Sequence, residues 1–427
     1  MKKIGFWSVF ALVTGSQIGS GIFMAPSALA PYGILAISGW LVSAIGAVSL
    51  AMVFGSLCAK FPNTGGPHVY INKLFGKHLA FFTGWTYWVI SWVSTTVVIV
   101  TAVGSLSPFI GDASSSVYVT LELSLLILIT IVNFFGVHAA GRAEVVLTFF
   151  KFIPLLIIPV VVLFSFNSDN IQMSNVIYES PIFGSLAHTV LLTFWGFVGL
   201  EVATTPAGSV LNPSRTIPIA VVAGTMSVAA LYIFNSIAIM GAVPSNLLAQ
   251  SQAPYVTVVQ VVFGGNLHLL ISIITSIVCI GTVNAWTLTS GQIALGLAND
   301  GLLPKIFAKT NKNQAPIIAL FLSAIGSAPL IIMTSSKTLA QQIIDIIDFS
   351  AISFLFVYLI CTLALIKLSF QERKCSIYRL VYLSISVTFC SWVIYETQLK
   401  VLLISLSFVL TGLPLYLLWF KNKQYQK

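Results

Sequence analysis

The sequence predicts an all-α integral membrane protein with twelve transmembrane helices. Of its 427 residues, 57% are hydrophobic and only 7% are charged. A soluble domain has roughly 25% charged residues, so this composition cannot build a water-facing surface. The apolar residues also gather in runs of about 20, the length that spans a bilayer as a helix. The lipid bilayer is therefore the first predicted partner of the chain.

Twelve apolar segments follow one another along the chain. They span approximately residues 5–30, 36–58, 79–109, 116–137, 144–165, 183–210, 217–241, 266–297, 316–335, 343–367, 378–395 and 399–420. The first begins after Met1, Lys2 and Lys3, as a signal peptide would. It continues past Gly21 with no hydrophilic domain behind it, so we interpret it as the first spanning helix.

Lys and Arg residues gather on one side of the predicted membrane. With the N-terminus in the cytoplasm, all but three of the 20 fall on the cytoplasmic side. The exceptions are Lys337 and Lys400 outside, and Lys151 within a segment. Cytoplasmic loops of membrane proteins collect these residues. The asymmetry predicts cytoplasmic termini, with 421–427 as a tail, and it explains the net charge of +9 without a nucleic-acid partner.

Two of the segments contain glycine-rich interruptions. Thr14–Ile22, in segment 1, holds three glycines and two serines, and Thr193–Glu201, in segment 6, holds Gly196 and Gly199. Glycine inside a helix costs about 1 kcal/mol relative to alanine, so both helices are predicted to break there. Backbone that is unwound at membrane depth must be buried in protein or line a cavity.

The two interruptions lie five segments apart, which predicts two repeats of five helices. Residues 1–165 would form the first repeat and 183–367 the second, inverted because five is odd, while 378–420 would add helices 11 and 12. Paired interrupted helices mark the substrate site of secondary transporters, near the bilayer midplane. The sequence thus predicts alternating access. No phosphate-binding loop, metal-ligand cluster or nucleophile–base pair is apparent, so no cofactor and no enzymatic activity are expected.

Five stretches resemble signatures of the amino acid–polyamine–organocation transporters. They are, in order, Gly19–Phe23, Asn63–Tyr70, Phe194–Glu201, Asn212–Pro218 and Asn299–Pro304. Phe194–Glu201, Trp286–Gln292 and Tyr87–Trp92 look most like the bacterial basic amino acid/polyamine antiporters, in particular arginine–agmatine exchangers. The resemblance implies a LeuT-like fold in the bacterial inner membrane. It also implies an amino acid or polyamine substrate and leaves a homodimer open.

The unwound part of segment 1 is the first candidate for substrate binding. Free N–H groups over Ser16–Gly21 could bind a carboxylate, helped by the dipole of the half-helix that follows. The resemblance implies that this loop binds the α-carboxylate of the substrate. The predicted substrate-binding residues are Ser16, Ile18, Gly19, Ser20, Gly21, Tyr87, Ser91, Thr95, Trp195, Val198, Trp286 and Ser350.

Trp286 is the main argument for a cationic substrate. A guanidinium or ammonium over a tryptophan face gains roughly 0.5–2 kcal/mol, and the resemblance implies that Trp286 stacks on the substrate. Thr95 departs from the arginine exchangers, which have an asparagine at this position. This departure leaves ornithine, lysine or a smaller neutral amino acid open.

Gating and proton coupling are predicted for Trp195, Glu201, Lys151 and Tyr358. The resemblance implies that Trp195 closes over the substrate and that Glu201 is linked to protons. An ionisable residue within the membrane is costly and usually functional. The alternatives are a core role for either tryptophan and a structural hydrogen bond for Glu201.

Lys151 has two interpretations. Its side chain could snorkel toward the inner surface, or it could lie buried against the unwound part of segment 1. In proton-coupled symporters of the superfamily, a lysine at this place replaces a sodium ion. The sequence therefore predicts an exchanger of cationic amino acids, with a proton-coupled, sodium-independent symporter that uses Lys151 as the alternative.

Overall fold

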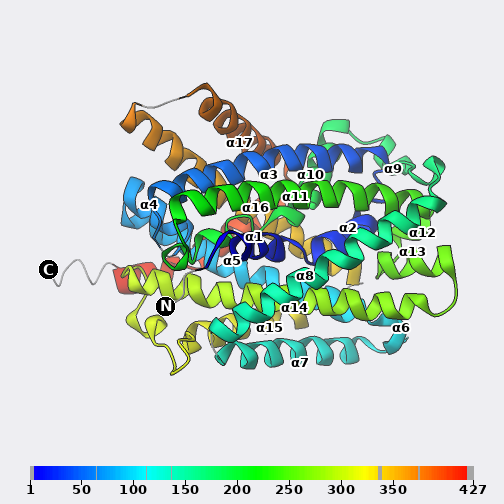
Figure 1. Cartoon of the computed structure of the whole chain (residues 1–427), viewed down its shortest axis with the longest axis horizontal. Helices are drawn as coiled ribbons and strands as arrows, with labels where there is room; N and C mark the ends of the chain where they lie inside the picture. The colour runs from blue at the N-terminus through cyan, green and yellow to red at the C-terminus, as the bar shows by residue number, and fades with distance from the viewer. Residues whose placement is uncertain are drawn as a thin grey trace.

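The computed structural model describes residues 4–63, 65–111, 113–135, 137–334, 339–373 and 376–420. Within these ranges the chain is almost entirely helical (Figure 1). Extended backbone is paired only in two isolated bridges of the described chain, Ile4 with Val210 and Tyr32 with Met173.

The long helices run along a common direction and are joined by short ones (Figure 1). The α-helices are α1 (Phe6–Gln17), α2 (Ser20–Leu29), α3 (Ile34–Lys60), α4 (Pro67–Phe75), α5 (Lys77–Gly104), α6 (Ser107–Ile110), α7 (Ser115–Phe134), α8 (Val137–Val162), α9 (Asn175–Tyr178), α10 (Ile182–Phe194), α11 (Pro213–Ala242), α12 (Ser245–Ala249), α13 (Pro254–Phe263), α14 (Leu267–Asn299), α15 (Ile317–Thr334), α16 (Leu339–Glu372), α17 (Ile377–Glu396), α18 (Leu399–Leu410) and α19 (Leu413–Leu415). Single turns are η1 (Leu163–Ser165), η2 (Ser168–Asn170), η3 (Trp195–Phe197), η4 (Val202–Thr204), η5 (Ala207–Ser209), η6 (Lys305–Ala308) and η7 (Tyr416–Phe420).

Ten helical stretches of the described chain are long and apolar enough to cross a membrane. This agrees with the predicted multi-pass membrane protein. Two further predicted segments, 144–165 and 316–335, fall on α8 and α15. Their apolar parts in the described chain, Lys151–Ser165 and Ile317–Met333, are shorter than the other ten. The count of twelve spanning helices therefore stays a prediction.

The backbone leaves helical geometry in both glycine-rich stretches. Between α1 and α2, Ile18 is extended and Gly19 is non-helical. After α10 the chain makes the single turn η3, becomes extended at Val198 and takes a positive φ of 106° at Gly199. The sequence predicts unwinding at these same two places.

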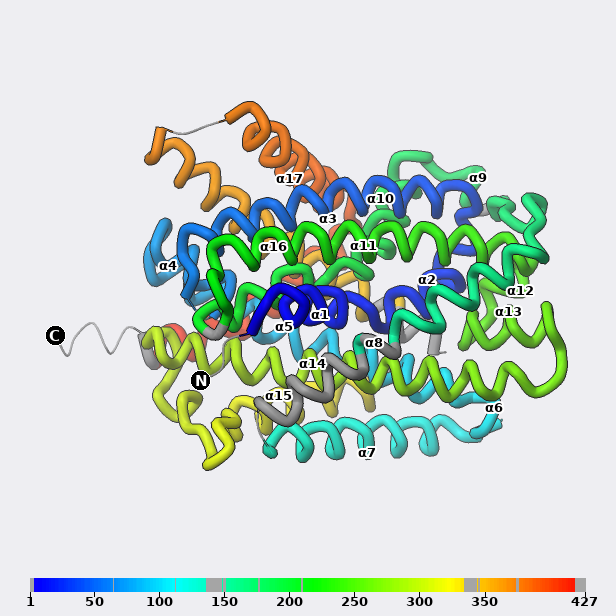
Figure 2. The backbone as a smooth tube through the Cα atoms, in the orientation of Figure 1, coloured from blue at the N-terminus to red at the C-terminus, as the bar shows by residue number. Residues whose placement is uncertain are grey.

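The interrupted helices occupy the middle of the bundle. In Figure 2, α1 and α2 lie at the centre, and α1 contacts α8, α11 and α14. In the apolar 18-residue core of each span, buried positions make up 89% for Ile182–Thr204 but only 11% for Leu399–Leu418. The breaks are thus enclosed by protein, as unwound backbone in a membrane requires, while α18 lies at the periphery.

A proline in α8 shows how freed backbone groups are satisfied here. Pro159 has no N–H to donate to the carbonyl of Leu155, four residues earlier. Asn235 Nδ2 of α11 donates to that carbonyl at 2.8 Å, and Tyr255 OH of α13 donates to Asn235 Oδ1 at 2.9 Å. These two bonds join α8, α11 and α13 beside the central helices.

Basic side chains mark one end of the bundle. Lys60 at the end of α3 forms an ion pair with Glu372 at the end of α16, and Lys367 Nζ donates to the carbonyl of Leu74 in α4 at 2.8 Å. We call this the basic end; α4 lies there, and α6, α9, α12 and α13 lie at the opposite end (Figure 1).

Candidate functional site

The break after α1 frees backbone carbonyls that would otherwise lie unpaired at membrane depth. The last carbonyls of a helix have no partner within it. Four successive carbonyls here accept hydrogen bonds from side chains of α8, α11 and α14. Lys151 Nζ donates to Gly15 O (2.8 Å), Trp286 Nε1 to Ser16 O (3.2 Å), Tyr232 OH to Gln17 O (2.7 Å) and Thr282 Oγ1 to Ile18 O (2.7 Å). Side chains of three packed helices therefore supply the hydrogen bonds that the interrupted helix cannot make itself.

The second break packs directly against the first. Ser16 Oγ lies 3.0 Å from Gly199 O and 2.9 Å from Val13 O, so its hydroxyl connects α1 to the loop after η3. A Cβ atom at Gly21 would lie 2.8 Å from Gly196 Cα. Glycine is required at this contact because real Cβ atoms do not approach backbone so closely.

Gly21→Ala is expected to lower the stability of the protein by about 1–3 kcal/mol, because the added methyl group overpacks the contact with Gly196. The thermal unfolding midpoint in detergent would measure the loss. Gly5→Ala is the matched control, because a Cβ atom there meets nothing within 4 Å. Equal midpoints for the two variants would contradict the close approach of the breaks.

A narrow pocket lies beside the two breaks. It is lined by Ser16, Gln17, Gly19, Ser20, Gly21, Ser94, Val98, Trp195, Val198, Thr282 and Trp286. Seven of the twelve predicted substrate-binding residues are among these. The side chains of both tryptophans that line it are buried, so the pocket lies within the protein core.

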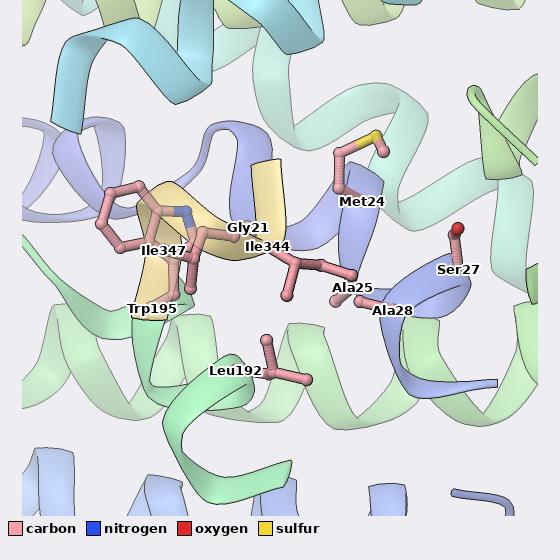
Figure 3. Close-up of a pocket in the computed structure, with 9 residues that line it drawn as sticks. All are labelled: Gly21, Met24, Ala25, Ser27, Ala28, Leu192, Trp195, Ile344 and Ile347. Carbon is pink, nitrogen blue, oxygen red and sulfur yellow. The ribbon is translucent and has the colours of Figure 1, made fainter. Parts of the chain in front are cut away.

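Trp195 separates this pocket from a second one. The second pocket is lined by Gly21, Met24, Ala25, Ser27, Ala28, Leu192, Trp195, Ile344 and Ile347, and Figure 3 shows Trp195 and Ser27 at its opposite sides. Trp195 Nε1 donates to Ser20 Oγ at 3.3 Å, which fixes the indole across the break. Because α2 leads away from the basic end (Figure 1), the second pocket lies on that far side. Trp195 thus lines both pockets.

A polar cluster links the elements at the far side of the second pocket. The hydroxyl of Tyr32, just after α2, lies 2.6 Å from His188 Nδ1 of α10, and His188 Nε2 lies 3.5 Å from Asp348 Oδ1 of α16. Burial, and then the charge of Asp348, raise the pKa of Tyr32 to about 12. The hydroxyl therefore stays protonated at physiological pH.

Glu201 lies on the other side of the break, in a cluster of tyrosines. Its carboxylate is buried and accepts from Tyr87 OH of α5 at 2.7 Å and from Tyr358 OH of α16. A Cβ atom at Gly66, the residue before α4, would lie 4.0 Å from the Tyr87 ring. The cluster thus faces the basic end and connects three helical regions. Tyr87, which we predicted to contact substrate, lines neither pocket.

Four other predicted residues also lie outside the two pockets. Ser91 Oγ donates to Trp88 O at 2.6 Å and Thr95 Oγ1 to Ser91 O at 2.9 Å, so both hydroxyls are engaged within α5. Ser94 and Val98 lie on the face of α5 that lines the pocket. Ile18 is buried and contributes its carbonyl to Thr282. Ser350 is buried, and its hydroxyl has no partner in the described chain.

Lys151 is completely buried, so the structure shows the second of its two interpretations. Besides the carbonyl of Gly15, its ammonium group donates to Thr282 Oγ1 at 2.9 Å. Thr282 also lines the pocket. The hydroxyl group of Thr282 therefore lies between Lys151 and the candidate binding site. The bond from Lys151 to Gly15 O stabilises the unwound end of α1.

The prediction missed Gln17, Ser94, Val98 and Thr282. Gln17 had a signal in the sequence, because it is the one amide side chain within the Thr14–Ile22 interruption. Ser94 and Val98 are four residues apart and share a helix face. Nothing in the sequence distinguishes that face from the one with Ser91 and Thr95.

Known proteins resemble this chain over most of its length. The sequence pattern of the family described as Amino acid permease matches residues 4–424. The cadaverine/lysine antiporter of Escherichia coli (strain K12) is 31% identical over 333 residues, which are 78% of this chain and 75% of that protein. The putrescine transporter PotE of the same strain is 29% identical over 367 residues, 86% of this chain and 83% of that protein. PotE of Haemophilus influenzae is 30% identical over 374 residues, 87% and 86% of the two chains.

These matches confirm the resemblance predicted from the five motifs. They agree with the apolar helices, the paired breaks and the pocket between them. The chain therefore belongs to the amino acid permease family, and it is a multi-pass membrane transporter rather than an enzyme.

Proposed function

We propose that this protein exchanges a cationic amino acid for its decarboxylated amine, or for another amino acid, across the cytoplasmic membrane. The observation that carries this proposal is the pocket between the two breaks, with Trp195 on one side and the Glu201 cluster on the other. A site with a barrier on each side is what alternating access requires. The relatives that are named antiporters or transporters of lysine, cadaverine and putrescine support this substrate class.

The pocket offers complementary groups to the two ends of an amino acid. The first N–H groups of α2, from Gly19 to Gly21, have no partner within the helix and can bind the carboxylate. The indole of Trp286 can stack on the cationic end, a contact worth roughly 0.5–2 kcal/mol. Arginine, ornithine and lysine all have these two ends.

The proposed architecture follows the superfamily. Twelve spanning helices would comprise inverted repeats over 1–165 and 183–367, with two more helices over 378–420. The basic end would face the cytoplasm, because Lys and Arg collect there, and would hold both termini. The tail at 421–427 is outside the described residues. A homodimer remains a prediction of the resemblance.

Proton-coupled symport is the second candidate, and the buried Lys151 favours it. A fixed ammonium group beside the α1 break can take the place of a bound sodium ion. Both candidates are therefore expected to transport equally well in sodium and in potassium buffers.

The proposal is tested with purified protein in proteoliposomes. Uptake of radiolabelled lysine or arginine is measured with and without internal cadaverine, agmatine or ornithine, at pH 5 and pH 7. We expect uptake only when a counter-substrate is inside. Uptake into empty vesicles that follows an inward proton gradient would instead establish the symporter. Protein-free liposomes are the control, and no uptake under any condition would contradict the substrate class.

A further inference from the structure

Two polar atoms that border the pocket have no partner. Gln17 Oε1, at the end of α1, and Ser94 Oγ, in α5, make no hydrogen bond within the described chain. Both side chains line the pocket and are only 3% exposed. An unpaired buried polar atom is costly. Two of them at one pocket indicate that a ligand supplies the missing hydrogen bonds.

The other polar groups around the pocket are already engaged. Ser16 Oγ bonds to backbone carbonyls, Ser20 Oγ accepts from Trp195, and Thr282 Oγ1 lies between Lys151 and the carbonyl of Ile18. The four carbonyls freed by the break accept from side chains as well. Gln17 Oε1 and Ser94 Oγ are thus the side-chain oxygen atoms of the pocket lining that make no hydrogen bond within the described chain.

The chemistry of these two atoms selects the group that they can bind. An amide oxygen only accepts hydrogen bonds, and a hydroxyl oxygen accepts as well as donates. A primary ammonium has three donors that point in different directions. It suits single oxygens from separate helices, whereas a guanidinium presents a planar fork that matches a carboxylate. No carboxylate is among the residues that line the pocket.

We propose that Gln17 and Ser94 form the subsite that receives the side-chain ammonium group of the substrate. This inference rests on the proposed function and narrows its substrate class. Amino acids with a side-chain ammonium, such as lysine and ornithine, and diamines are preferred over arginine, whose side chain ends in a guanidinium. The carboxylate stays at the α2 N-terminus, and Trp286 packs against the chain between the two ends.

The test combines two variants with a series of lysine analogues. Ser94→Ala and Gln17→Leu are assayed for inhibition of lysine exchange by norleucine, which lacks the side-chain ammonium, and by 6-aminohexanoate, which lacks the α-ammonium. Each variant is expected to raise the KM for lysine about tenfold, because a hydrogen bond to a charged group is lost. Inhibition by norleucine should not change, whereas inhibition by 6-aminohexanoate should weaken with that by lysine.

Thr96→Val is the matched control for Ser94→Ala. Thr96 is also buried in α5, but its hydroxyl donates to Val93 O at 2.6 Å and it does not line the pocket. The KM for lysine should be the same in this variant as in the wild type. A tenfold rise here would overturn the assignment to Ser94.

Gln17→Glu tests the subsite through an increase in affinity, which a misfolded protein would not show. A carboxylate at this position should strengthen inhibition by cadaverine relative to norleucine, because norleucine has no ammonium at its side-chain end to meet the carboxylate. Equal effects of the loss variants on all analogues, or a Gln17→Glu protein with unchanged cadaverine inhibition, would overturn the inference. A wild type that transports none of these compounds would instead refute the proposed function.

Discussion

Lys151→Ala is expected to reduce exchange by on the order of a hundredfold. The substitution removes the donor to Gly15 O and to Thr282 Oγ1, so two buried acceptors at the α1 break lose a partner. An unsatisfied buried polar group costs about 1–3 kcal/mol, and each 1.4 kcal/mol is a factor of about ten. The initial rate of lysine counterflow in proteoliposomes measures the loss.

Two further variants separate the charge of Lys151 from its bulk. Lys151→Met keeps most of the volume and should be nearly as impaired as Lys151→Ala. Thr282→Val removes one acceptor but keeps the bond to Gly15, so an intermediate rate is expected. Normal transport by Lys151→Ala, with the pH dependence of the wild type, would refute the role of Lys151 in place of a sodium ion.

Glu201→Gln is expected to abolish the pH dependence of transport. The Glu201 carboxylate accepts from two tyrosine hydroxyls and is enclosed on all sides. A carboxylate can take up and release a proton, whereas an amide cannot. Rates measured between pH 5 and pH 8 should therefore vary in the wild type and be constant in the variant.

Glu201→Ala should have the larger effect on the rate, again on the order of a hundredfold, because it leaves both tyrosine hydroxyls without their acceptor. Tyr87→Phe and Tyr358→Phe each remove one donor and keep the carboxylate. They should slow transport less and retain its pH dependence. A Glu201→Gln protein with the wild-type pH profile would exclude Glu201 as the proton-linked residue.

Several features of the site were predictable from local sequence. The break after Gln17 follows from the glycines of Thr14–Ile22, because helix propensity is a local property. Trp195 and Trp286 were recognisable as large aromatic residues with a hydrogen-bonding N–H group within apolar segments, and both line the pocket. Glu201 was conspicuous as a carboxylate within a membrane segment.

Other features depend on how the helices rotate about their axes. In the apolar 18-residue core of α5, 94% of the positions are buried, so no exposed polar face indicates the orientation of this helix. The prediction therefore used the face of Ser91 and Thr95, although Ser94 and Val98 line the pocket. Tyr87 was predicted to contact the substrate for the same reason, and the structure shows its hydroxyl bonded to Glu201.

The sequence by itself determined the membrane class, the two helix breaks and the family, because composition, glycine content and short motifs act within single segments. Only the tertiary structure decided which side chains satisfy the freed carbonyls and which line the pocket. The donor to Ile18 O, for example, is Thr282, 264 residues away in the chain. Such pairs are set by the packing of α8, α11 and α14 around the break. A helix that is apolar on every face has no polar stripe in its sequence to indicate which face packs against which neighbour.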